Sequence, residues 1–170
     1  MFAVRSLLAS WLALAAGQAA AQEVWQLEAR AVPFDDGSAG VPLAYEPLER
    51  AARPWRLCIL YPHLKDAYWL SVNYGMVEEA MRLGVAFDVF EAGGYPNLTR
   101  QIEQLRGCAG GNFDAVILGA VSYEGLTPEV EEIAALKPVI ATVNDIDDLG
   151  ITAKASVPWY EMGASAGRFI

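Results

Sequence analysis

The feature that most constrains this chain is a regular alternation of short apolar runs with amphipathic segments, which begins at Trp55. The runs read RLCILY, VAFDVFEA, DAVILGA, PVIATVN and KASVPW, and segments of helical spacing separate and follow them. Such an alternation is typical of an α/β fold in which helices cover both faces of a parallel sheet. We therefore predict a parallel sheet with right-handed crossovers from Trp55 onward.

The first helical segment, residues 66–84, shows both of its ends in the sequence. Asp66 stands where an N-cap residue is expected, and Gly84 stands where a helix ends on a glycine. An apolar stripe on one face of this segment is formed by Leu70, Tyr74, Val77 and Met81.

Aromatic residues gather in the loops that follow the predicted strands. In open α/β sheets, ligands bind outside the carboxyl ends of the strands. Tyr68, Trp69, Tyr95 and Trp159 lie in three such loops. Each ring alone is equally well explained by packing. Together they predict a box for a ligand with an apolar or cationic surface, beside which the carboxylate of Asp66 would suit a positive group.

The N-terminal third differs from the rest. Residues 1–21 have the features of a cleavable secretory signal: a basic start, a short apolar run and the small residues Ala19–Ala21. Residues 22–54 carry scattered proline and glycine, which predicts an irregular N-terminal extension. We expect a periplasmic protein without direct membrane insertion, because no later apolar run is long enough to span a bilayer. The sequence ends inside a helical pattern, so we expect the front part of a longer protein.

Charge and motifs argue against several functions. With 21 Asp and Glu against 12 Lys and Arg, the chain lacks the basic footprint of a nucleic-acid-binding protein. Its one histidine, His63, has no partner motif for nucleophilic or metal chemistry, and no phosphate loop follows a strand. Asp145, Asp147 and Asp148 lack the pattern of a calcium loop and are interpreted as a solvated turn. We expect no enzyme, no cofactor and no metal.

Two cysteines remain to be explained, Cys58 and Cys108. An even number of cysteines in an exported protein favours a disulfide. The alternative is a pair of buried free thiols, because the sequence does not give the Cα separation that a bridge requires.

Three stretches of the sequence are similar to a known family. RLCILYPHLKDAYWLSVNYGMVEEAMRLGVAFDVFEAGGYPN, DAVILGAVS and VPWYEMGASAGRF resemble the periplasmic sensors of trimethylamine N-oxide, which are type I periplasmic binding proteins related to sugar-binding proteins. The resemblance runs from about Trp55 to the end and includes the positions of both cysteines. It implies two α/β lobes around a cleft, of which residues 55–170 form the first, truncated lobe.

The resemblance also implies a function. A family member binds trimethylamine N-oxide in an aromatic cleft between the lobes and signals to a membrane sensor histidine kinase that controls trimethylamine N-oxide respiration. The implied ligand-binding residues are Asp66, Tyr68, Trp69, Tyr95 and Trp159. Such a protein is a sensor and not an enzyme.

Two alternatives remain open. One is a periplasmic sugar-binding protein that delivers its ligand to a transporter. Sugar sites need many planar polar groups, and the obvious ones here are Asp66, Asn73 and Asn144. The other is an enzyme of doubly wound fold, for which the sequence shows no catalytic constellation.

Overall fold

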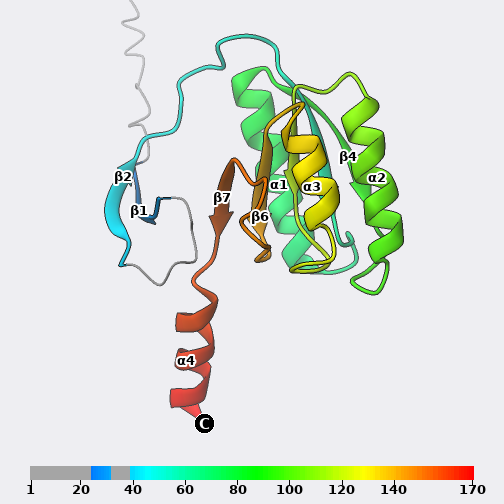
Figure 1. The fold of residues 1–170 in the computed structure, drawn as a ribbon. Helices are drawn as coiled ribbons and strands as arrows, with labels where there is room; N and C mark the ends of the chain where they lie inside the picture. The colour runs from blue at the N-terminus through cyan, green and yellow to red at the C-terminus, as the bar shows by residue number, and fades with distance from the viewer. Residues whose placement is uncertain (1–23, 32–38) are drawn as a thin grey trace, which may run out of the picture.

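The computed structural model describes residues 24–31 and 39–170. Its centre is a five-stranded, wholly parallel sheet with the strand order β4-β3-β5-β6-β7 (Figure 1). The strands are β3 (Arg56–Tyr61), β4 (Ala86–Glu91), β5 (Ala115–Leu118), β6 (Val139–Val143) and β7 (Ala153–Ser156). The predicted parallel sheet is therefore confirmed.

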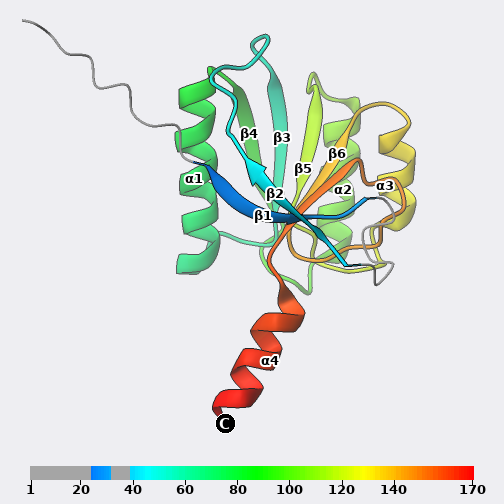
Figure 2. The ribbon, with the colours of Figure 1, turned by 90° about the vertical axis from the view of Figure 1, so that its left-hand side faces the viewer.

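Helices cover both faces of this sheet, as predicted (Figure 2). Helix α1 (Ala67–Leu83) packs on one face, while α2 (Leu98–Gly110) and α3 (Thr127–Ala134) pack on the other. Strand residues alternate between the two layers: Cys58 and Leu60 join the α2/α3 layer, whereas Ile59 and Tyr61 join the α1 layer. A sheet buried on both sides explains why its strands are apolar throughout.

Helix α1 has the predicted caps, but its apolar stripe is not its buried face. Asp66 accepts a hydrogen bond from the backbone N–H of Trp69 at 2.9 Å, and Gly84 takes the left-handed conformation at φ 67°. The stripe that includes Tyr74 and Met81 faces solvent, because these side chains are 65% and 75% exposed. Trp69 packs into the core in its place.

The predicted disulfide between Cys58 and Cys108 is present and joins β3 to α2. The two Cα atoms lie 5.9 Å apart, and both residues are buried. The bridge therefore links the sheet covalently to the α2/α3 layer across a sequence separation of 50 residues.

The segment before Trp55 is not irregular throughout, so that expectation is wrong for two stretches. Strands β1 (Trp25–Ala29) and β2 (Val41–Tyr45) form a separate antiparallel pair. Their cross-strand contacts, such as Trp25 opposite Tyr45, place apolar residues on one shared face. The proline and glycine residues of this segment obscure its strand pattern in the sequence, and the pairing of β1 with β2 shows it. The predicted signal peptide, residues 1–21, lies outside the described residues.

The acidic turn after β6 is an ion-pairing site and not merely a solvated turn. The ammonium group of Lys154 on β7 lies 3.0 Å from the carboxylate of Asp145 and 2.8 Å from that of Asp148. The Lys154 side chain is 5% exposed, so these acids balance a buried charge at the sheet edge. Beyond β7, helix α4 (Trp159–Phe169) leaves the sheet and buries none of its residues (Figure 1).

Among residues 24–31 and 39–170, no helix has the length and apolar character needed to cross a membrane.

Candidate functional site

The candidate site lies at the carboxyl ends of the parallel strands, on the side of the sheet where α4 begins (Figure 1). An open hollow there is formed by loops that follow β4, β5, β6 and β7. Its lining consists of Tyr95, Tyr123, Asn144, Asp145, Trp159 and the stretch Ala120–Ser122. Aromatic and amide groups thus face one space, in the position where α/β sheets bind ligands.

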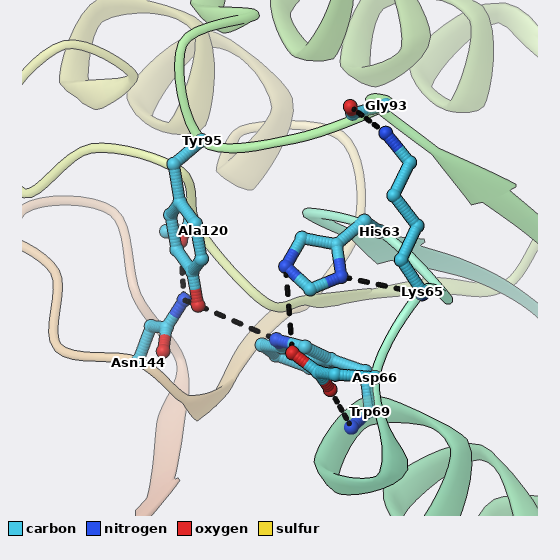
Figure 3. A network of polar contacts seen from close by, with 8 residues as sticks. All are labelled: His63, Lys65, Asp66, Trp69, Gly93, Tyr95, Ala120 and Asn144. Atoms are coloured by element: carbon cyan, nitrogen blue, oxygen red, sulfur yellow. Dashed lines mark hydrogen bonds and ion pairs between the residues drawn. The ribbon is translucent and has the colours of Figure 1, made fainter.

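The hydroxyl of Tyr95 is the centre of a polar network beside this hollow (Figure 3). Its oxygen accepts from the indole Nε1 of Trp69 and from the amide Nδ2 of Asn144, each at 3.3 Å. The same amide nitrogen of Asn144 donates to the carbonyl of Ala120 at 2.7 Å. Since two donors approach the Tyr95 oxygen, its own hydrogen is left to be donated elsewhere.

Trp69 lies behind the hollow and does not line it. Its side chain is 1% exposed, and its ring packs at a centroid distance of 5.3 Å from Tyr61. Only its N–H reaches the site, through Tyr95. The explanation of Trp69 as a core residue, which the sequence left open, therefore holds for its ring.

Tyr68 and Asp66 stand at the start of α1, next to Trp69. Tyr68 is half-exposed and meets the Trp69 ring edge-on at a centroid distance of 6.0 Å. One carboxylate oxygen of Asp66 caps the helix, and the other lies 3.7 Å from Nε2 of His63 (Figure 3). Neither residue lines the hollow itself: Asp66 ends the loop that contains His63, and Tyr68 lies in the first turn of α1.

Trp159 is the first residue of α4 and ties this helix to the sheet. Its indole N–H donates to the carbonyl of Val143, the last residue of β6, at 3.1 Å. Val143 has φ 66°, and the N–H of Asn144 bonds back to the carbonyl of Thr142 at 2.8 Å. This is a strained three-residue turn, which a β-branched residue rarely adopts. The turn leads directly into Asn144, whose amide reaches Tyr95.

Sequence reasoning missed several residues of this region. Val143 gave no signal, because nothing in an apolar strand announces a positive φ. Tyr61 was counted only as a strand residue, yet its hydroxyl is buried and has no hydrogen-bond partner among the described residues. Burial raises the pKa of Tyr61 to about 12. Asn144 was named from the sequence only as a polar group for a sugar site, although a polar residue directly after a buried strand lies where such sheets bind ligands.

The described residues contain no group of His, Cys, Asp and Glu that would hold a metal ion. The chemistry that this arrangement offers is recognition: aromatic faces, one directed hydroxyl and nearby carboxylates.

The chain belongs to the family of periplasmic binding proteins and the sugar-binding domain of the LacI family, whose model matches residues 54–169. Among curated proteins, it is 44% identical over 121 residues to the periplasmic protein TorT of Escherichia coli K12. The alignment covers 71% of this chain and 35% of TorT, so the chain spans about a third of the length of such relatives.

Solved structures agree with this assignment. An ABC transporter solute-binding protein from Bradyrhizobium sp. BTAi1, with bound bis-tris, is 44% identical at a TM-score of 0.79. That match covers 85% of this chain and 44% of the other, so it extends into the segment before residue 54. TorT in its complex with the TorS sensor domain, in the presence of trimethylamine N-oxide, is 44% identical at a TM-score of 0.62, over 68% of this chain and 40% of that one. The predicted fold class and the resemblance to TorT are confirmed.

Proposed function

We propose that this chain forms the ligand-binding part of a periplasmic sensor of trimethylamine N-oxide. The observation that carries the proposal is the Tyr95 hydroxyl, which receives two hydrogen bonds and is left with one hydrogen to donate beside an aromatic hollow. A ligand that suits this arrangement presents one strong acceptor and a methylated surface.

Trimethylamine N-oxide has both properties. Its oxygen accepts hydrogen bonds, and its methylated nitrogen carries positive charge that aromatic faces attract. In the proposed site, Tyr95 donates to the oxygen, while Trp159, which lines the hollow, presents its ring to the methyl groups. Tyr68 lies outside the hollow, beside Trp69. Trp69 acts from behind by orienting Tyr95. Asp66 balances the positive nitrogen at a distance, since one of its oxygens already caps α1.

The relatives support this class of ligand. TorT was crystallised with TorS in the presence of trimethylamine N-oxide, and the Bradyrhizobium protein was solved with bis-tris bound. Both small molecules are built around a nitrogen that carries three carbon substituents. We therefore propose an alkylated nitrogen as the common element of recognition.

The same relatives suggest the partner and the compartment. We propose that residues 55–170 supply the first lobe of a two-lobed binding protein in the periplasm, delivered there by the signal at residues 1–21. The proposed partner is the periplasmic domain of a TorS-like sensor histidine kinase. In this proposal the protein transmits a ligand-dependent shape and catalyses no reaction.

Calorimetric titration tests the ligand. The chain is titrated with trimethylamine N-oxide, with trimethylamine, which lacks the oxygen, and with a panel of pentoses and hexoses. We expect binding of the N-oxide, weaker binding of the amine, and none of the sugars. Binding of a sugar without binding of the N-oxide would favour delivery to a transporter and would contradict the proposal.

A second titration tests the two-lobe proposal. We expect the chain alone to bind the N-oxide more weakly than a relative that has both lobes, because a cleft ligand takes contacts from each lobe. Equal affinities would contradict a site shared between lobes.

A further inference from the structure

A buried amide on α2 holds the loop that forms one wall of the hollow. Gln101 is 0% exposed. Its Nε2 donates to the carbonyl of Gly119 at 3.0 Å, and its Oε1 accepts from the backbone N–H of Val121 at 2.8 Å. Both ends of one side chain are thus bonded to the loop that follows β5. A buried amide that bonds one loop through both its nitrogen and its oxygen fixes the position of that loop.

This loop contacts the two groups that orient Tyr95. A Cβ atom on Gly119 would lie 2.6 Å from the ring of Trp69, so the backbone of the loop lies directly against the indole. The next carbonyl, that of Ala120, accepts from Asn144. Trp69 and Asn144 are the two donors to the Tyr95 oxygen.

We propose that Gln101 is a positioning residue of the ligand site. It acts through the Gly119–Val121 loop, which holds Trp69 and Asn144 in the places from which they donate to Tyr95. The direction of the Tyr95 hydroxyl thereby depends on a side chain that touches no ligand. The effect on ligand affinity rests on the proposed function, whereas the effect on Trp69 is measurable without any ligand.

The matched comparison is Gln101→Met with Gln104→Met. Both residues are on α2, both substitutions keep the side-chain length, and Gln104 also donates to a backbone carbonyl, that of Glu91 at 2.9 Å. Gln104 makes no bond to the Gly119–Val121 loop. A purely structural role for Gln101 predicts that the two variants behave alike once their stabilities are matched.

The decisive readout is the indole N–H of Trp69, followed by NMR in the whole chain. In Gln101→Met we expect this resonance to shift and its hydrogen exchange to accelerate, because the Trp69–Tyr95 bond loosens. We also expect the affinity for trimethylamine N-oxide to fall by about five- to thirtyfold, the factor that a loss of 1–2 kcal/mol gives. In Gln104→Met we expect neither change.

An unchanged Trp69 resonance in Gln101→Met, or an equal change in Gln104→Met, overturns the proposal. If wild type binds no trimethylamine N-oxide, the proposed ligand fails, and the indole resonance still decides the role of Gln101. If Gln101→Met does not fold, Gln101→Asn replaces it, because the shorter amide keeps a polar group at this position but cannot reach both Gly119 and Val121. A Trp69 resonance that stays unchanged in Gln101→Asn overturns the proposal as well.

Discussion

The hydrophobic layers on the two faces of the central sheet contain different types of side chain. The layer between the sheet and α2/α3 is aliphatic, includes the Cys58–Cys108 bridge, and contains Gln101 with both ends of its amide bonded. The layer under α1 contains the rings of Tyr61 and Trp69, a buried hydroxyl without a partner among the described residues, and the strained Val143.

This difference separates stability from recognition. Aliphatic packing and a covalent bridge hold one layer together, and both ends of the buried Gln101 amide are bonded. On the same helix, Oε1 of Gln104 is buried without a partner among the described residues. The aromatic layer retains strain and an unpaired hydroxyl next to the candidate site, which is where such features collect in binding proteins. Changes in the α2/α3 layer are therefore expected to alter unfolding, whereas changes at the rim of the aromatic layer are expected to alter ligand affinity.

Trp69→Ala gives the largest expected effect, because Trp69 contributes both to the hydrophobic core and to the orientation of Tyr95. Its ring fills the core, so removal costs about 3–5 kcal/mol of the free energy of unfolding, and its N–H orients Tyr95. A side chain that is 1% exposed is not removed without such a loss. Urea unfolding measures the loss. The control is Trp159→Ala, a 44% exposed ring whose removal should lower affinity with little loss of stability.

Removal of the disulfide gives the next largest effect. In the double variant Cys58→Ala/Cys108→Ala, a sequence separation of 50 residues is no longer bridged. The free energy of unfolding should fall by roughly 3–4 kcal/mol, mainly because the unfolded chain regains freedom. Urea unfolding of both proteins checks this, and ligand affinity of the folded variant should stay at the wild-type value. A large loss of affinity would contradict the assignment of stability to the α2/α3 layer and of ligand recognition to the aromatic layer.

Tyr95→Phe tests the rim of the aromatic layer. The ring remains, but the acceptor for Trp69 and Asn144 and the free hydroxyl hydrogen are lost. We expect affinity for trimethylamine N-oxide to fall by about 1.5 kcal/mol, the value of a hydrogen bond to a charged or strongly polar group. The free energy of unfolding should fall by about 1 kcal/mol, because the indole N–H of the buried Trp69 loses its acceptor. Calorimetry and urea unfolding together give both numbers.

Tyr61→Phe gives the smallest effect and the only one expected to stabilise. It removes a buried hydroxyl without a partner among the described residues, so we expect a gain of about 1 kcal/mol at neutral pH.

The alkaline pH dependence of Tyr61→Phe sharpens this test. Burial raises the pKa of Tyr61 from 10.0 to about 12, so the unfolded chain releases the phenol proton first. The corresponding stability is present below pH 10 and is lost as pH rises through about 12. Urea unfolding across this range should show a steeper decline in wild type than in Tyr61→Phe. Parallel curves would show that Tyr61 has an ordinary pKa.

The sequence predicted what depends on local pattern. Alternating apolar runs gave the sheet, Asp66 and Gly84 gave the ends of α1, and the two cysteines gave the bridge. The sheet and the helix ends follow from periodicity and capping, which are properties of neighbouring residues, whereas the bridge follows from the even number of cysteines in an exported protein.

What the sequence did not predict depends on partners far along the chain. The stripe with Tyr74 and Met81 looks like a core face, yet Trp69 takes the core position because the glycine at residue 119 leaves room for its ring. The role of Gln101 arises only when α2 meets the loop after β5. The loop positions of the proposed site residues could be read from the strand ends, but their mutual distances could not.

The central claim is that trimethylamine N-oxide binds at the rim of the aromatic layer, and NMR of the indole N–H groups tests it most directly. The described residues include four tryptophans: Trp25 lies on β1, Trp55 lies just before β3, Trp69 lies on α1 and Trp159 lies on α4. On addition of trimethylamine N-oxide, the resonances of Trp159 and Trp69 should shift, while those of Trp25 and Trp55 should stay in place. No shift at Trp159 and Trp69, or shifts confined to Trp25 and Trp55, would contradict the account.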